Sequence, residues 1–126
     1  MVGQRFVTLI AGHPWFELTA VAASSRSAGK TYEEAAAGRW MMPTPIPQQV
    51  RNLIVSSAEE NIGQITDSVD FVFSAVDMKK DEIKALEEAY AKSECPVISN
   101  NSAHRWTPDV PMVIPEINPG HLDVIP

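Results

Sequence analysis

Apolar and polar positions follow each other along this chain in short blocks of two kinds. Near the start, apolar residues recur at the spacing of one helix face, at Val2, Phe6, Leu9 and Ile10. Gly12-His13-Pro14 then predicts the end of that helix. Further along, short and nearly continuous apolar runs predict strands at residues 17–24, 52–57, 69–76, 95–100 and 112–117. Such runs are typical of parallel strands covered on both faces.

Helical patterns lie between these predicted strands. Residues 77–93 carry an apolar stripe and a charged opposite face, which predicts an amphipathic helix. Residues 31–38 predict a shorter helix, with Thr31 as its cap, Glu34 three residues later and Gly38 as its terminator. Three prolines between residues 43 and 47 predict an irregular surface crossover at residues 41–47.

Strands and helices that alternate in this way predict an α/β fold, a Rossmann-like doubly wound parallel sheet. In that fold the first strand lies centrally, and the turn after it holds the phosphates of a nucleotide cofactor. This chain opens on a helix instead. We therefore expect a truncated sheet, without its first and central strand, in a single domain of 126 residues.

Composition narrows the possible partners. Apolar residues make up 44% of the chain and the net charge is −6, with no basic stripe, so a nucleic-acid partner is not expected. No apolar run is long enough to cross a membrane, and the start lacks the pattern of a signal peptide. One cysteine excludes an internal disulfide and a multi-cysteine zinc site. These features predict a cytoplasmic protein without a metal.

The segment after the first predicted strand, residues 24–30, carries serines and an arginine but no acidic residue. Enzymes that prefer NAD usually place Asp or Glu here, to accept hydrogen bonds from the ribose 2′-hydroxyl. A guanidinium and hydroxyls can instead bind a 2′-phosphate. One interpretation is a preference for NADP; an ordinary polar turn is the alternative.

Two other strand ends carry candidate chemistry. Small residues, Ser74 and Ala75, follow Phe73 at the end of one predicted strand, where a cofactor could approach the backbone or where helix packing alone could require them. After the next strand, residues 99–105 bring amides, a hydroxyl and an arginine, which suit an anion or a plain surface loop.

Other reactive residue types give weaker signals. Cys95 precedes Pro96 at the start of a predicted strand, opposite the expected crevice, and is interpreted as a buried packing residue. The histidines have no ligand-like spacing and are expected to be solvated or hydrogen-bonded. Asp67, Asp70 and Asp77 are interpreted as caps.

Four stretches together resemble the N-terminal cofactor domain of aspartate-semialdehyde dehydrogenase, in the form shared by archaea, fungi and some bacteria. They are residues 2–6 (the tail of Gly-Ala-Thr-Gly-X-Val-Gly-Gln-Arg-Phe), 22–30, 99–105 and 109–118. The resemblance covers essentially the whole chain in order. It implies a partial NAD(P)-binding domain over residues 1–126, with the catalytic and dimerisation domain absent.

The resemblance also implies a reaction and roles for single residues. The family reduces L-4-aspartyl phosphate with NADPH to L-aspartate 4-semialdehyde and phosphate, on the route to lysine, methionine and threonine, and its members are homo-oligomers. Val2 would end the phosphate-binding turn, and Ser25, Arg26 and Ser27 would hold the NADP 2′-phosphate. Ser74 would lie near the cofactor. Asn100 and Arg105 would bind the phosphate of the acyl phosphate substrate; Asn101 departs from the usual Ser-Asn-Ala-Ser pattern.

The cysteine nucleophile and the catalytic histidine of the family have no counterpart here, so no catalytic residue is assigned. We expect the chain alone to be inactive and to bind NADPH weakly. Two alternatives stay open: part of N-acetyl-γ-glutamyl-phosphate reductase or malonyl-CoA reductase, or a non-enzymatic nucleotide-binding module.

Overall fold

The computed structural model describes all residues, 1–126. Its helices are α1 (Val2–Ile10), α2 (Tyr32–Ala36), α3 (Gln48–Arg51), α4 (Ile62–Thr66), α5 (Lys80–Lys92) and the 3₁₀ helix η1 (Pro119–Val124). Its strands are β1 (Val21–Ala23), β2 (Val55–Ser57), β3 (Val72–Ser74) and β4 (Val97–Ser99). The predicted α/β class with parallel strands is confirmed.

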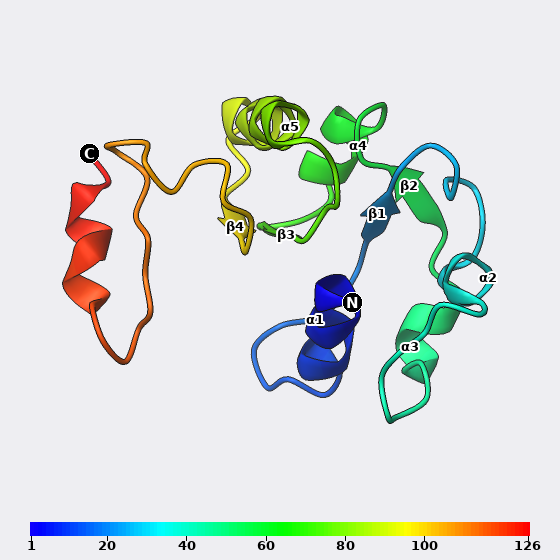
Figure 1. Cartoon of the computed structure of the whole chain (residues 1–126). Helices are drawn as coiled ribbons and strands as arrows, with labels where there is room; N and C mark the ends of the chain where they lie inside the picture. The colour runs from blue at the N-terminus through cyan, green and yellow to red at the C-terminus, as the bar shows by residue number, and fades with distance from the viewer.

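The strands form two separate two-stranded parallel sheets, β1 with β2 and β3 with β4. Figure 1 shows the strands in the order β4, β3, β1, β2, so that β3 and β1 are the inner pair. No ladder joins β1 to β3. The two inner strands therefore belong to different sheets.

The main core lies under β3 and β4, against α4 and α5. Its buried residues are Ala58, Ile65, Leu86 and Tyr90, and Val72 and Val97 pack against them. The Tyr90 hydroxyl donates a hydrogen bond to the C=O of Ala58, just after β2, at 2.9 Å. Helix α5 therefore connects the β3/β4 half of the molecule with the end of β2.

Helix α1 packs on β3 from its other face. The rings of Phe6 and Phe73 stack at 4.7 Å between centroids, and an added Cβ on Gly3 would lie 3.8 Å from that of Ala75. Successive strand side chains point to opposite faces, and Val72 faces the α5 core. Phe73 therefore places α1 on the opposite face.

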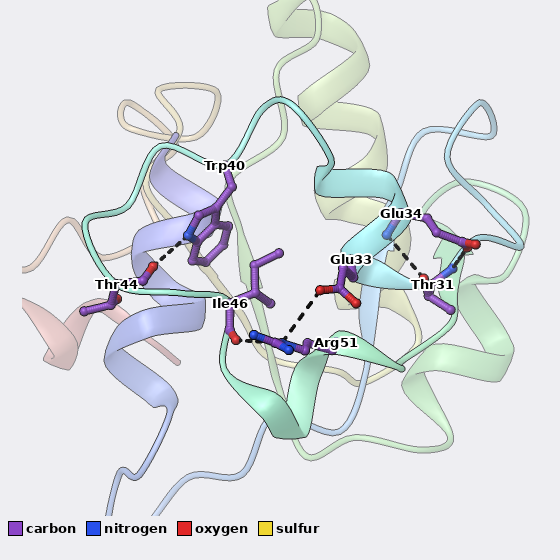
Figure 2. A network of polar contacts seen from close by, with 7 residues as sticks. All are labelled: Thr31, Glu33, Glu34, Trp40, Thr44, Ile46 and Arg51. Carbon is purple, nitrogen blue, oxygen red and sulfur yellow. Dashed lines mark hydrogen bonds and ion pairs between the residues drawn. The ribbon is translucent and has the colours of Figure 1, made fainter.

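The β1/β2 half is covered by two short helices and the proline-rich crossover. The predicted capping box of α2 is present, with Thr31 Oγ1 accepting from the Glu34 N–H at 3.2 Å. Figure 2 shows how the crossover is fixed: the Trp40 indole donates to the C=O of Thr44 at 2.8 Å, and Arg51 donates to that of Ile46 at 3.2 Å. The Arg51 contact fixes the irregular segment to α3, and an ion pair between Arg51 and Glu33, at 3.8 Å, joins α3 to α2.

The strand predicted at residues 112–117 is wrong, because this segment contains no strand. The side chain of Asn118 donates to the Met112 C=O at 2.9 Å and accepts from the Ile114 N–H at 2.7 Å. His121 Nδ1 accepts from the Met112 N–H at 3.0 Å. Side chains thus satisfy the backbone groups that a neighbouring strand would have bonded.

Candidate functional site

A cavity of about 490 Å³ opens at the carboxyl end of β1. Four parts of the chain line it: the start of α1, the end of β1 with the turn after it, α2, and the segment after β3. The lining residues are Met1, Gln4, Ala22, Ala23, Ser24, Ser27, Tyr32, Ala35, Ala36, Arg39, Val55 and Asp77. In parallel α/β sheets ligands bind beyond the carboxyl ends of the strands. The position of this cavity matches that rule.

The turn after β1 is held in place by the backbone of its neighbours. Gly29 N–H donates to the C=O of Val55, and Val55 N–H donates to that of Lys30, both at 2.8 Å. Gly29 has a φ of 82°, in the left-handed region that favours glycine. The loop is therefore fixed to β2 although its tip is exposed.

The predicted 2′-phosphate residues occupy this turn. Ser27 is half-buried and lines the cavity, whereas Ser25 and Arg26 are exposed at the tip beside it. The Arg26 guanidinium has no hydrogen-bond or ion-pair partner in the chain. A free cation and hydroxyls at one turn can bind an anion at the cavity mouth.

Helix α1 directs its N-terminus at the same region. Val2 is its first residue and is 46% exposed. The first N–H groups of a helix have no partners inside it. Met1 and Gln4 line the cavity, and the Gln4 amide also bonds Arg39 C=O at 2.7 Å and Met41 N–H at 2.9 Å. Gln4 and Asp77 were not among the predicted site residues. The sequence alone does not show which face of α1 meets the cavity, and that face is what identifies Gln4.

Ser74 lies at the end of β3, in a partly buried polar cluster around Glu87 rather than on the cavity wall. Glu87 of α5 is 6% exposed, and its carboxylate accepts from the Ser74 hydroxyl at 2.7 Å and the Ser99 hydroxyl at 2.5 Å. The Asn101 amide donates to the same oxygen at 3.2 Å. Glu87 therefore connects the carboxyl ends of β3 and β4.

This cluster gives a structural use to Asn101, the residue that departs from the usual pattern. Its amide also contacts the Ser74 hydroxyl at 3.2 Å. Sequence analysis missed Glu87, because a glutamate at the polar margin of a helical stripe looks like a solvated one. Its spacing of four residues from Ile83 and three from Tyr90 was the available signal.

Asn100 and Arg105 follow β4 and are both exposed. Asn100 N–H donates to the Ser74 C=O at 3.2 Å, which fixes the start of the loop to β3. Neither the Asn100 amide nor the Arg105 guanidinium bonds another side chain. Both groups are therefore free to meet an anion from solvent.

The weaker candidates occupy structural positions. Cys95 is 4% exposed before the amino end of β4, and burial raises the pKa of its thiol. His13, His104 and His121 all make hydrogen bonds through Nδ1. No group of His, Cys, Asp and Glu is arranged to hold a metal ion. None of the helices has the length and apolar character that crossing a bilayer requires.

The family model for the semialdehyde dehydrogenase NAD binding domain matches residues 1–125. The chain belongs to this family. The match covers the turn after β1, the strand ends and the loop after β4, so the candidate sites above all lie on the family's NAD-binding domain. The recognised family is thus confirmed.

Curated relatives agree with the family match. The chain is 45% identical over 126 residues to aspartate-semialdehyde dehydrogenase of Methanothermobacter thermautotrophicus and 42% identical over 125 residues to that of Aspergillus fumigatus. These alignments cover 99% of this chain but 34% and 32% of the relatives. The chain therefore spans about a third of the length of the curated relatives it matches.

A solved structure agrees with the fold. The crystal structure of aspartate-semialdehyde dehydrogenase with NADP from Candida albicans matches with a TM-score of 0.83 at 35% identity. It covers 97% of this chain and 32% of that one. The Rossmann-like arrangement of the semialdehyde dehydrogenase domain is thereby confirmed.

Proposed function

We propose that this semialdehyde dehydrogenase domain serves an aspartate-semialdehyde dehydrogenase. The reaction would be the NADPH-dependent reductive dephosphorylation of L-4-aspartyl phosphate to L-aspartate 4-semialdehyde and phosphate, in lysine, methionine and threonine biosynthesis. The observation that carries the proposal is identity of 42–45% with enzymes of that name along 99% of this chain.

The cavity beyond β1 is the site that we propose for NADP. Ser25, Arg26 and Ser27 would hold the 2′-phosphate, because they offer hydroxyls and a free guanidinium with no carboxylate in the turn. The N-terminus of α1, from Val2, would face the cofactor's phosphates, where helix N–H groups and the helix dipole favour negative charge. Ser74 would lie near the cofactor from the end of β3. When bound, the cofactor supplies a hydride.

The loop after β4 would bind the substrate's phosphate. Arg105 and Asn100 are exposed and unpaired, so they lose no internal contact when they meet an anion. The buried Glu87 carboxylate holds Ser99 and Asn101, which lie on either side of Asn100. The residues proposed to bind the substrate's phosphate therefore follow a strand end that is held in place.

The chain's own thiol does not suit covalent catalysis. Cys95 is buried before the amino end of β4, and its raised pKa lowers the thiolate population that a nucleophile needs. We therefore propose that the 126 residues alone are inactive. The active enzyme would be a cytoplasmic homo-oligomer, acting on a small acyl phosphate and not on nucleic acid.

The test compares NADPH with NADH on this chain by ligand-observed NMR, which detects weak binding. NADPH should bind at least about tenfold more tightly, and Arg26→Gln should remove that preference, since a charge-assisted contact contributes roughly 1.5–3 kcal/mol. Arg5→Gln, an exposed arginine on α1, is the matched control and should keep it. Equal binding of the two cofactors, or turnover of aspartate semialdehyde by the chain alone, would contradict the proposal.

A further inference from the structure

A second cavity, of about 500 Å³, lies at the amino end of β1, opposite the end that opens to the proposed cofactor site. Three parts of the chain line it: the end of α1 with the turn after it, the segment that enters β1, and α3 with the residues that follow that helix. The two cavities share no lining residue. A volume of this size is typical of sites for small molecules.

The turn after α1 builds an aromatic wall for this second cavity. Gly12 has a φ of 75°, and the N–H of His13 donates to the C=O of Ile10 at 2.8 Å, so the chain turns sharply where the helix ends. His13 Nδ1 then accepts from the N–H groups of Trp15 and Phe16, both at 3.1 Å. The imidazole stacks on the Phe16 ring, with 4.5 Å between the centroids and 8° between the planes. The chain's own hydrogen bonds therefore hold this wall in place.

The most buried part of the cavity lining is apolar. Ile10, the last residue of α1, is 8% exposed, and Leu18 and Leu53 are half-buried. A ligand that covers these side chains removes apolar surface from water. Together with the stacked rings, this lining favours a ligand with an aromatic body.

Charge at the cavity favours a cation. The Glu17 carboxylate lines it, is exposed and has no ion-pair partner in the chain, and no lysine or arginine lines the cavity. Helix α1 ends here, where the helix dipole is negative, and the C=O groups of Thr8 and Leu9 accept no hydrogen bond. His13 adds no positive charge in this geometry, because a nitrogen that accepts two hydrogen bonds carries no proton.

Two neutral side chains add oxygen acceptors. The Thr19 hydroxyl and the Gln49 amide both line the cavity, and neither forms a hydrogen bond within the chain. An ammonium group has three protons to donate. With the Glu17 carboxylate, the cavity offers one side-chain acceptor for each of them.

We propose that this cavity binds a small aromatic amine in its ammonium form. The aromatic body would lie against the wall of His13 and Phe16, and the ammonium would meet the Glu17 carboxylate. The inference is independent of the proposed function, because it uses neither the Arg26 turn nor the Arg105 loop and lies at the other end of β1 from the proposed cofactor site.

The experiment titrates the ¹⁵N-labelled full chain with tryptamine and follows chemical shifts by NMR. The backbone signals of Leu18 and Leu53 and the indole signal of Trp15 should move, since Trp15 lies edge-on to His13 at 5.9 Å. The indole signals of Trp40 and Trp106 should stay. Tryptophol carries a hydroxyl in place of the ammonium and should bind at least about fivefold more weakly. Indole-3-propionate, an anion, should not bind detectably.

Variants outside the core separate the contribution of charge from that of shape. Glu17→Gln should reduce the preference for tryptamine over tryptophol to less than about twofold. The matched control is Glu59→Gln, because Glu59 is an exposed carboxylate after β2 that does not line the cavity. It should keep the preference. Gln49→Trp, at an exposed position of α3, should fill the cavity and weaken the binding of both probes at least about tenfold.

Three outcomes would overturn the proposal. The first is no shift at Leu18 and Leu53 with millimolar tryptamine. The second is equal binding of the ammonium, hydroxyl and carboxylate probes, because charge would then have no part in recognition. The third is unchanged tryptamine binding in Gln49→Trp, which would place the amine elsewhere on the molecule.

Discussion

The two half-sheets of this molecule are stabilised in different ways. The β3/β4 half rests on α5, a helix of 13 residues that buries Leu86, Tyr90 and a carboxylate, Glu87. The β1/β2 half is covered by α2 and α3, of five and four residues, and its polar contacts are mostly exposed (Figure 2). The half proposed to bind the cofactor therefore has the weaker supports, and the half beside the substrate loop has the stronger ones.

The largest effect should come from the core of the β3/β4 half. Leu86→Ala deletes a side chain that is 8% exposed between β3 and α4, and should cost about 2–5 kcal/mol of unfolding free energy. Urea titration followed by far-UV circular dichroism measures it. The matched control is Leu9→Ala, since Leu9 is 63% exposed and its truncation should cost under about 0.5 kcal/mol. Equal losses in the two variants would remove the distinction drawn above.

Glu87 tests the polar part of the same support. Glu87→Ala leaves three donors without their shared acceptor and should cost about 3 kcal/mol. Glu87→Gln keeps one acceptor oxygen and should lose roughly half as much. Glu88→Ala, the neighbouring glutamate with no bonded partner, is the control. If Glu87→Ala were as stable as the control, the cluster would not support the strand ends.

In the β1/β2 half, the strongest local stabilising interaction is the cap at the start of α2. Thr31→Ala removes the acceptor for the Glu34 N–H and should lower the free energy of unfolding by about 1 kcal/mol. Thr31→Ser keeps a hydroxyl acceptor and should retain most of that stability. Thermal unfolding at pH 7 separates the two variants. A loss as large as that of Leu86→Ala would contradict the weaker support assigned to this half.

Glu34 adds a pH dependence to this cap. Its hydrogen bonds with the backbone and then the side chain of Thr31 lower the pKa of its carboxyl from 4.5. A depressed folded-state pKa means that the contribution is present above 4.5 and is lost as the pH falls through the folded value. The variant Glu34→Gln should therefore lose part of the acid dependence of the melting temperature.

The smallest effect belongs to the exposed ion pair between α2 and α3. Arg51 Nε lies 3.8 Å from Glu33 Oε1, with side chains 41% and 56% exposed. Glu33→Gln should change the unfolding free energy by less than about 0.5 kcal/mol. A double-mutant cycle with Arg51→Gln measures the coupling, and a value above about 1 kcal/mol would show that this network supports the half more than its exposure implies.

Much of the fold could be predicted from the pattern of apolar residues in the sequence. The stripe of α5, the Thr31 cap and the parallel strands were all predicted, because periodicity and capping are local properties. The strand at residues 112–117 was not correctly predicted, because Asn118 and His121 satisfy its backbone and apolar content alone does not reveal such bonds. Helices α3 and α4 were missed, since four or five residues are too few for a periodic signal.

The candidate site also has residues that local sequence patterns predict and residues that they do not. The turn at Ser27 and the loop at Asn100 follow strands, so strand prediction placed them at sheet ends. Gln4, Asp77 and Glu87 come from α1, from the segment after β3 and from α5, and they meet the site through tertiary packing. Their roles depend on distances across the fold, which no local pattern records.

The Tyr90 hydroxyl sets an alkaline limit for the contact between the two halves. Burial, and then the nearby Cys95, raise the pKa of Tyr90 above its ordinary value of 10.0. A raised folded-state pKa contributes stability that is fully present below 10.0 and is lost as the pH rises through the folded value. A phenolate has no proton to donate to the Ala58 C=O. Strong base therefore breaks the hydrogen bond that joins α5 to the end of β2 and leaves only the apolar packing between Tyr90 and Ala58.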